Sequence, residues 1–170
     1  MLFRSEASLP PDFLWLFKLN PLYVLVSGYR DVLLNGSPGE IDLLESIAGA
    51  AATNPVVLPS LGTTLGSLKP IVQRAGLMVT NDTGPRHIAA AFGVPMVTLF
   101  GPTDHRWTSI PTRPEGPEAI LLADPTLPAG EAANDHPERC RVDRITLERV
   151  LGAVDSLLQP PEMPEPGEIG

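Results

Sequence analysis

Residues 77–104 hold the side chains best suited to chemistry, in the order LMVTNDTGPRHIAAAFGVPMVTLFGPTD. A short apolar run ends in Thr-Asn-Asp-Thr-Gly-Pro, an alanine-rich stretch follows, and a second apolar run (96–100) ends in Gly-Pro-Thr-Asp. This order predicts a strand, a helix and a parallel strand, which together form a βαβ unit. Unpaired N–H groups and the helix dipole favour an anion where the first loop opens onto the helix. The segment is therefore suited to binding a phosphate or diphosphate.

The residues of that turn fit this interpretation one by one. Asp82 or Thr83 can cap the helix through a side-chain oxygen, and Gly84 leaves no Cβ in the path of a ligand. Pro85 suits the first helical turn, where its missing N–H loses no helical bond. His87 lies one turn after Thr83, so both can face one ligand. A capped crossover helix without a ligand remains the alternative, because P-loop and Gly-x-Gly-x-x-Gly spacings are both absent.

Alternating apolar runs and amphipathic stretches surround this unit. We expect strands at residues 32–34, 55–58, 77–79, 96–100 and 119–122, and helices at 40–52, 64–75, after Pro85, and 146–158. Strands that alternate with helices predict an α/β fold, a Rossmann-like parallel sheet with helices on both faces. The predicted inner faces of the first three helices are Ile41, Leu44, Ile47 and Ala48; Leu65, Leu68, Ile71 and Val72; and Ile88, Ala91 and Phe92.

Ligands of such a sheet bind beyond the carboxyl ends of its strands. Loops at residues 36–40, 59–64, 80–84 and 100–104 all follow predicted strands. They should therefore converge on one crevice, as a nucleotide-diphosphate site requires.

The two ends of the chain differ from its middle. We expect an irregular segment at 1–21, the Rossmann-like domain at 22–158, and a disordered proline-rich tail at 159–170. The apolar run at 13–26 is too short to span a membrane and is interrupted by Lys18, Asn20 and Pro21. A buried segment leading into a first strand is the preferred interpretation, with a membrane anchor as the alternative.

Composition narrows the function classes. The net charge is −8, which argues against nucleic acid as a partner because phosphate backbones bind basic surfaces. Cys140 is the only cysteine, so an internal disulfide and a cysteine zinc site are excluded. His105 and His136 lack a supporting spacing and should be surface residues. Trp107 could cover the crevice, although a packing role is the preferred expectation.

Three segments in order resemble glycosyltransferase family 9, the ADP-heptose:lipopolysaccharide heptosyltransferases and their relatives. They are NDTGPRHIAAA (81–91), GVP (93–95) and LFGPTD (99–104), similar to the family pattern (S/N)-D-T-G-x-x-H-L-A-A-A, Gly-x-Pro and (L/Y)-(F/Y)-G-P-T-D-P. Mild departures occur at Ile88 and His105. A weaker resemblance covers about residues 32–158, including GSPGE (36–40) and ITLERV (145–150).

The resemblance implies a fold, a site and an activity. The chain would correspond to the C-terminal, donor-binding half of a GT-B glycosyltransferase. Thr83, Gly84 and His87 would bind the diphosphate of a nucleotide-sugar, with Asp82 orienting the loop or contacting sugar hydroxyls. The remaining implied site residues are Glu40, Thr64 and Leu65 for the nucleoside and Gly101, Pro102, Thr103 and Asp104 lining the cleft. An ordinary acid in the first helical turn is the alternative for Glu40.

The resemblance also implies how transfer would work. Amides and His87, rather than a metal, would stabilise the departing diphosphate, since an Asp-x-Asp pattern is missing; no cofactor is expected. No acceptor base can be assigned, and the Lys-x-Trp-Pro-like opening of the family's C-terminal domain is not found in residues 1–30. We therefore expect a donor-binding half, either truncated or working with a separate N-terminal acceptor domain.

Other expectations and alternatives follow. The donor would be an ADP-sugar such as ADP-heptose, the acceptor of lipopolysaccharide type, and the location cytoplasmic, including the inner membrane face, without stable membrane insertion. A non-catalytic nucleotide or nucleotide-sugar binding module is the main alternative. A relative of the UDP-N-acetylglucosamine 2-epimerases is a more distant one.

Overall fold

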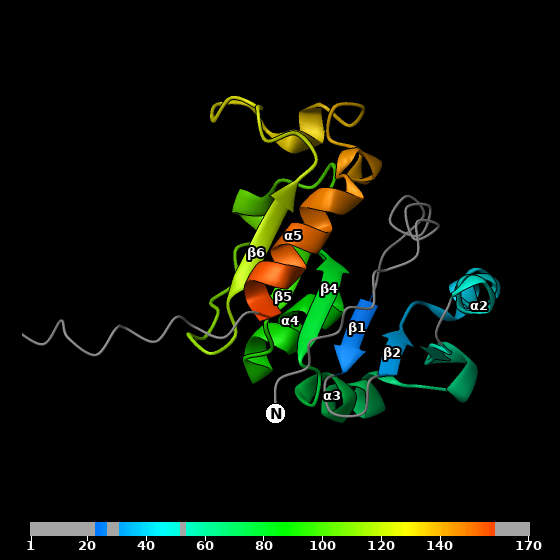
Figure 1. Ribbon diagram of the computed structural model, residues 1–170. Helices are drawn as coiled ribbons and strands as arrows, with labels where there is room; N and C mark the ends of the chain where they lie inside the picture. Colours follow the sequence, from blue (N-terminus) through cyan, green and yellow to red (C-terminus); the bar gives the residue numbers. More distant parts are fainter. Residues whose placement is uncertain (1–22, 27–30, 52–53, 159–170) are drawn as a thin grey trace, which may run out of the picture.

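The computed structural model describes residues 23–26, 31–51 and 54–158 (Figure 1). Within these residues six strands form one sheet in the order β3-β2-β1-β4-β5-β6. Their bounds are β1 (Tyr23–Val26), β2 (Asp31–Leu34), β3 (Val56–Val57), β4 (Leu77–Asn81), β5 (Met96–Phe100) and β6 (Glu118–Leu122). Neighbouring strands are parallel except at β1, which pairs antiparallel with both β2 and β4. The predicted α/β sheet is confirmed, with one antiparallel strand inside it.

Four helices cover the two faces of this sheet. They are α2 (Ile41–Ala50), α3 (Leu65–Gln73), α4 (Gly84–Phe92) and α5 (Leu147–Leu158). One core cluster joins the sheet to α2 and α5, and a second joins its other face to α3 and α4. Figure 1 shows α5 in front of the sheet and α4 behind it. This arrangement confirms helices on both faces.

Two predicted inner faces need correction. In α4 the buried residues are Arg86, Ala89 and Ala90. Of the predicted stripe, Ile88 packs partly buried against the core, whereas Ala91 and Phe92 are exposed. Selecting the most apolar residues misplaced this stripe, because the helix turns a paired arginine and two small alanines toward the sheet. In α3 the exposed fraction of Leu65 is 64 %, since this first helical residue leans back toward the N-terminus.

The ends of the helices follow local sequence signals. Thr64 and Ser67 form a reciprocal capping box at the start of α3. Gly93 ends α4 with a φ of 69°, a left-handed conformation that favours glycine. These signals mark where α3 begins and where α4 ends.

The carboxyl ends of the parallel strands share one edge of the sheet. In Figure 1 the arrowheads of β2, β4 and β6 point the same way, and the loops after β5 and β6 gather beyond them. The predicted ends at 1–21 and 159–170 lie outside the described residues. In the described part, no helix is both long and apolar enough to cross a membrane.

Candidate functional site

The N-terminus of α4 opens at the carboxyl end of β4. Thr83 is the N-cap, but its side chain makes no capping hydrogen bond within the described chain. Gly84 is exposed, and a Cβ built there would meet nothing within 4 Å. A ligand can therefore approach the backbone at Gly84 without meeting a neighbouring side chain, and a helix N-terminus favours an anion there.

Arg86 fastens this turn to the sheet. Its side chain is fully buried, and its Nε and Nη2 donate to the two carboxylate oxygens of Glu118 at 2.7 and 3.2 Å. Its Nη1 donates both to Asp82 Oδ1 at 2.9 Å and to the Thr108 carbonyl at 2.7 Å. Thr98 Oγ1 adds a hydrogen bond to Glu118 at 2.5 Å. One guanidinium thus joins β6, the loop after β4 and the turn after β5.

The same group sets the local electrostatics. Burial alone would lower the pKa of Arg86, but the hydrogen bonds and charges of Glu118 and Asp82 outweigh it and raise the pKa above its ordinary value. The Arg86 guanidinium also lies 5.0 Å from the centre of the Phe100 ring. Asp82 is therefore paired with a permanent cation. This pairing reduces the repulsion that its carboxylate would exert on a nearby phosphate.

The expected side-chain cap from Asp82 or Thr83 is not formed in the described part of the chain, although Thr83 does occupy the N-cap position. Thr83 makes no side-chain cap within the described residues, and Asp82 contacts the Arg86 guanidinium instead. His87 is exposed one helical turn after Thr83. The four residues expected to serve the diphosphate thus lie together in the first turn of α4 and the loop before it.

The loop after β5 is fastened by a second ion pair, in which the carboxylate is buried and the arginine is partly exposed. Asp104, which is 2 % exposed, accepts from Arg106 Nε at 2.8 Å and from the Arg106 amide at 3.0 Å. The Ala133 amide donates to its other oxygen at 3.2 Å, and Asn134 Oδ1 accepts from the Asp104 amide at 3.0 Å. Hydrogen bonds from Arg106, then the two amides, hold the pKa of Asp104 well below its usual range despite burial.

A pocket of about 290 Å³ lies between the ends of β5 and β6 and the segment that follows β6. Gly101, Thr103 and Asp104, three residues of the predicted cleft loop, contribute to its wall, whereas Pro102 is exposed. Cys140 also lines it, and burial raises the pKa of this thiol. The wall carries the carboxylates of Asp104, Asp124 and Glu131 and the basic groups of His105 and Arg106.

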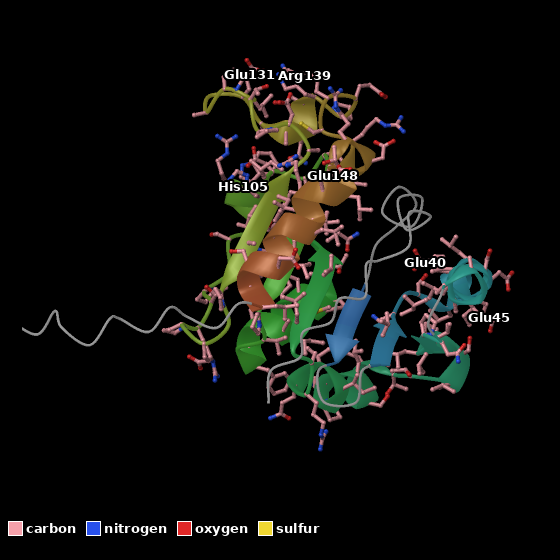
Figure 2. The ribbon with its side chains drawn as sticks, viewed as in Figure 1. Glu40, Glu45, His105, Glu131, Arg139 and Glu148 are labelled. Atoms are coloured by element: carbon pink, nitrogen blue, oxygen red, sulfur yellow. The ribbon has the colours of Figure 1, made fainter. Side chains whose placement is uncertain are left out.

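Glu40 lies beside α2, toward the end of the sheet formed by β2 and β3 (Figure 2). Its Oε2 accepts from the Ser37 amide and the Ser37 hydroxyl, both at 2.7 Å. A Cβ on Gly36 would lie only 3.0 Å from the same oxygen, so glycine leaves room for the turn. This contact matches the alternative of a local helix-start acid, and a ribose contact stays a prediction.

The two residues expected to flank a base begin α3. Thr64 exchanges capping hydrogen bonds with Ser67 at 2.9 and 3.3 Å. Leu65 and nearby Leu61 are exposed to 64 % and 71 %. Exposed apolar surface beside a strand end is available to a flat base.

The histidines and Trp107 complete the predicted set. The side chains of His105 and His136 are 36 % and 32 % exposed, and His136 pairs with Glu131 at 2.7 Å. Figure 2 places His105 far across the molecule from Glu40. Trp107 is 67 % exposed, so the expected packing role is wrong.

The sequence interpretation missed Arg86, Glu118 and Thr98. One signal was present: an arginine four residues after Asp82 inside an alanine-rich helix suggests an ion pair along that helix. Glu118 carried no such signal, because its contact with Arg86 spans 32 residues of chain.

Comparison with known proteins gives one consistent result. The family model described as glycosyltransferase family 9 (heptosyltransferase) matches residues 25–130. Lipopolysaccharide heptosyltransferase 3 from Escherichia coli is 39 % identical over 80 residues, and that of strain K12 is 35 % identical over 79. Each match covers 46 % of this chain and 23 % of the relative. The chain thus spans less than a quarter of these curated relatives.

A solved structure is similar as well. The glycosyl transferase family 9 protein from Veillonella parvula DSM 2008 superposes with a TM-score of 0.56 at 26 % identity. The superposition covers 74 % of this chain and 36 % of that one.

Proposed function

Because the chain belongs to glycosyltransferase family 9, we propose that it binds a nucleotide-diphospho-sugar at the N-terminus of α4. In this proposal it supplies the donor-binding half of a glycosyltransferase. The donor is an ADP-sugar, ADP-heptose by analogy with the heptosyltransferase relatives, and the acceptor is of lipopolysaccharide type. Such an acceptor would put the work of the protein at the cytoplasmic face of the inner membrane.

The observation that carries the proposal is the open first turn of α4. Gly84 has free space in front of it, the Thr83 side chain makes no cap among the described residues, and the Asp82 carboxylate is paired with Arg86. A diphosphate oxygen can therefore accept from the Gly84 amide without meeting a Cβ or an unpaired carboxylate. The exposed His87 adds a donor on the same turn.

The remaining groups take the other parts of the donor. In this proposal Leu65 and Thr64 flank the base, and Glu40 accepts from ribose hydroxyls once the Ser37 contact is shared or released. The loop at 101–104 follows β5, the strand next to β4, and lines the crevice near the diphosphate.

Transfer breaks the bond between the anomeric carbon and the diphosphate as an acceptor hydroxyl attacks that carbon. The diphosphate leaves with the bond's electron pair, and the Gly84 amide and His87 stabilise it without a metal. A base must take the acceptor's proton, and we assign that group to an N-terminal acceptor domain outside residues 1–170. The 170-residue chain alone should therefore bind donor but show negligible turnover.

Calorimetric titration with ADP tests the site. We expect Gly84→Val to weaken ADP binding at least about tenfold, the scale of a lost hydrogen bond to a charged group. Gly152→Val is the matched control, because Gly152 also lies in a helix with nothing near its Cβ position. Equal ADP affinity in the wild type and Gly84→Val would refute the site.

An assay with ADP-heptose and a deep-rough lipopolysaccharide acceptor tests the second half of the proposal. Turnover should appear only when an N-terminal acceptor domain is added. If such a domain never restores turnover although ADP still binds, the chain is a nucleotide-binding module instead.

A further inference from the structure

Trp107 is held out into solvent on a firmly fixed turn. The indole is 67 % exposed and sits in the 3-10 turn His105–Trp107 that follows β5. The Asp104 carboxylate caps the start of this turn by accepting from the Arg106 amide at 3.0 Å. The Arg86 guanidinium holds the end through the Thr108 carbonyl at 2.7 Å. An exposed aromatic ring on an anchored backbone loses little freedom on binding, as a ligand-contacting residue should.

A single atom, Arg86 Nη1, contacts both the turn that carries Trp107 and the loop before the proposed diphosphate site. Arg86 Nη1 donates to Thr108, the neighbour of Trp107, and also to Asp82, which lies just before the first turn of α4. One peptide unit, about 3.8 Å, separates Trp107 from Thr108. The indole and the open amide of α4 therefore belong to two loops joined by a single guanidinium nitrogen.

We propose that Trp107 forms a stacking face for the sugar ring of the nucleotide-diphospho-sugar, an inference that rests on the proposed function. In such a donor the sugar follows the second phosphate directly. A pyranose ring presents a face of C–H groups that packs against an aromatic π-face. The ring is uncharged, so the protein's net charge of −8 does not oppose it.

A sugar suits this position better than the base does. The base lies at the opposite end of the donor, beyond both phosphates and the ribose. In the sheet β2 and β3 lie on the other side of β1 from β4 and β5, and their loops carry the residues assigned to the nucleoside. Trp107, in the turn that follows β5, is therefore on the side where the sugar should project.

The test compares ADP with ADP-heptose by calorimetry on the wild type, Trp107→Ala and Trp107→Phe. We expect Trp107→Ala to weaken ADP-heptose binding by about 3- to 10-fold, the scale of one aromatic stacking contact, and to leave ADP binding unchanged. Trp107→Phe should restore most of the loss. Phe92→Ala is the matched control, because Phe92 is an exposed ring at the far end of α4.

Fluorescence gives an independent readout. In a Trp15→Phe background Trp107 is the only tryptophan, and its emission should shift to the blue with ADP-heptose but not with ADP.

Each outcome decides the proposal. Equal losses of affinity for ADP and ADP-heptose in Trp107→Ala would show that the indole contacts the nucleoside. No loss for either ligand would show that the indole lies outside the site. Both results overturn the stacking proposal while the proposed function stands. If the wild type binds neither ligand, the proposed function fails and the stacking role fails with it.

Discussion

The loops after β4 and β2 each hold an acidic side chain in a fixed position, but through different kinds of contact. Both follow a strand of the parallel sheet and open onto a helix. After β4, Asp82 is held by Arg86, which reaches across to Glu118 on β6 and to the Thr108 carbonyl. After β2, Glu40 is held by Ser37, three residues away in its own turn. One loop is fixed by long-range contacts and the other by local ones.

This difference distinguishes contacts that only fix the fold from groups that remain available to a ligand. Where the Arg86 side chain fixes the loop, the Gly84 amide at the start of the helix stays available to a ligand, whereas the Arg86 amide already donates to the Thr83 carbonyl at 3.0 Å. Where the acid itself fixes the turn, its carboxylate is already engaged. A motif residue can therefore serve the fold, the ligand or both, and the two loops predict different responses to mutation.

The largest expected effect is at Arg86. Arg86→Met keeps much of the apolar stem but leaves Glu118 buried without its cation, so the free energy of unfolding should fall by about 3–5 kcal/mol. Urea unfolding measures this change. The control is Arg74→Met at the C-cap of α3, an exposed arginine whose side chain donates, within the described residues, only to the Pro70 carbonyl nearby. Similar losses of unfolding free energy in the two variants would contradict the idea that long-range contacts of Arg86 fix this loop.

The smallest expected effect is at Glu40. Glu40→Gln and Ser37→Ala each disturb one local capping pair, so each should cost only about 0.5–1 kcal/mol of unfolding free energy. Titration with ADP then separates the two roles of Glu40. A ribose contact predicts weaker ADP binding in Glu40→Gln but not in Ser37→Ala, whereas a purely local role predicts no loss in either.

Much of the sheet could be predicted because strands and helices follow local patterns. The strand at 96–100 and the helix at 84–92 are bounded by turn residues such as Pro85 and Gly93, whose backbone preferences act locally. The position of the first turn of α4 was predictable for the same reason, since a strand followed by Asp-Thr-Gly-Pro is a local signal for the start of a helix. Glu118 was not, because nothing local to it signals a partner in α4.

The wrong predictions for Trp107 and Phe92 also arose because long-range contacts leave no local sequence signal. Trp107 was expected to pack because large aromatic side chains usually do, yet the turn that carries it is fixed by Asp104 and Arg86 with the indole outward. Phe92 was assigned to a buried stripe on apolarity alone, whereas the position of Arg86 sets which face of α4 meets the sheet.

The central claim is that the first turn of α4 binds the diphosphate, and amide NMR during an ADP titration tests it most directly. The account predicts that the largest shifts fall on the amides of Gly84, Arg86 and His87, and that Gly84→Val abolishes them. If those amides stay unmoved while residues around the pocket between β5 and β6 respond, the account is contradicted.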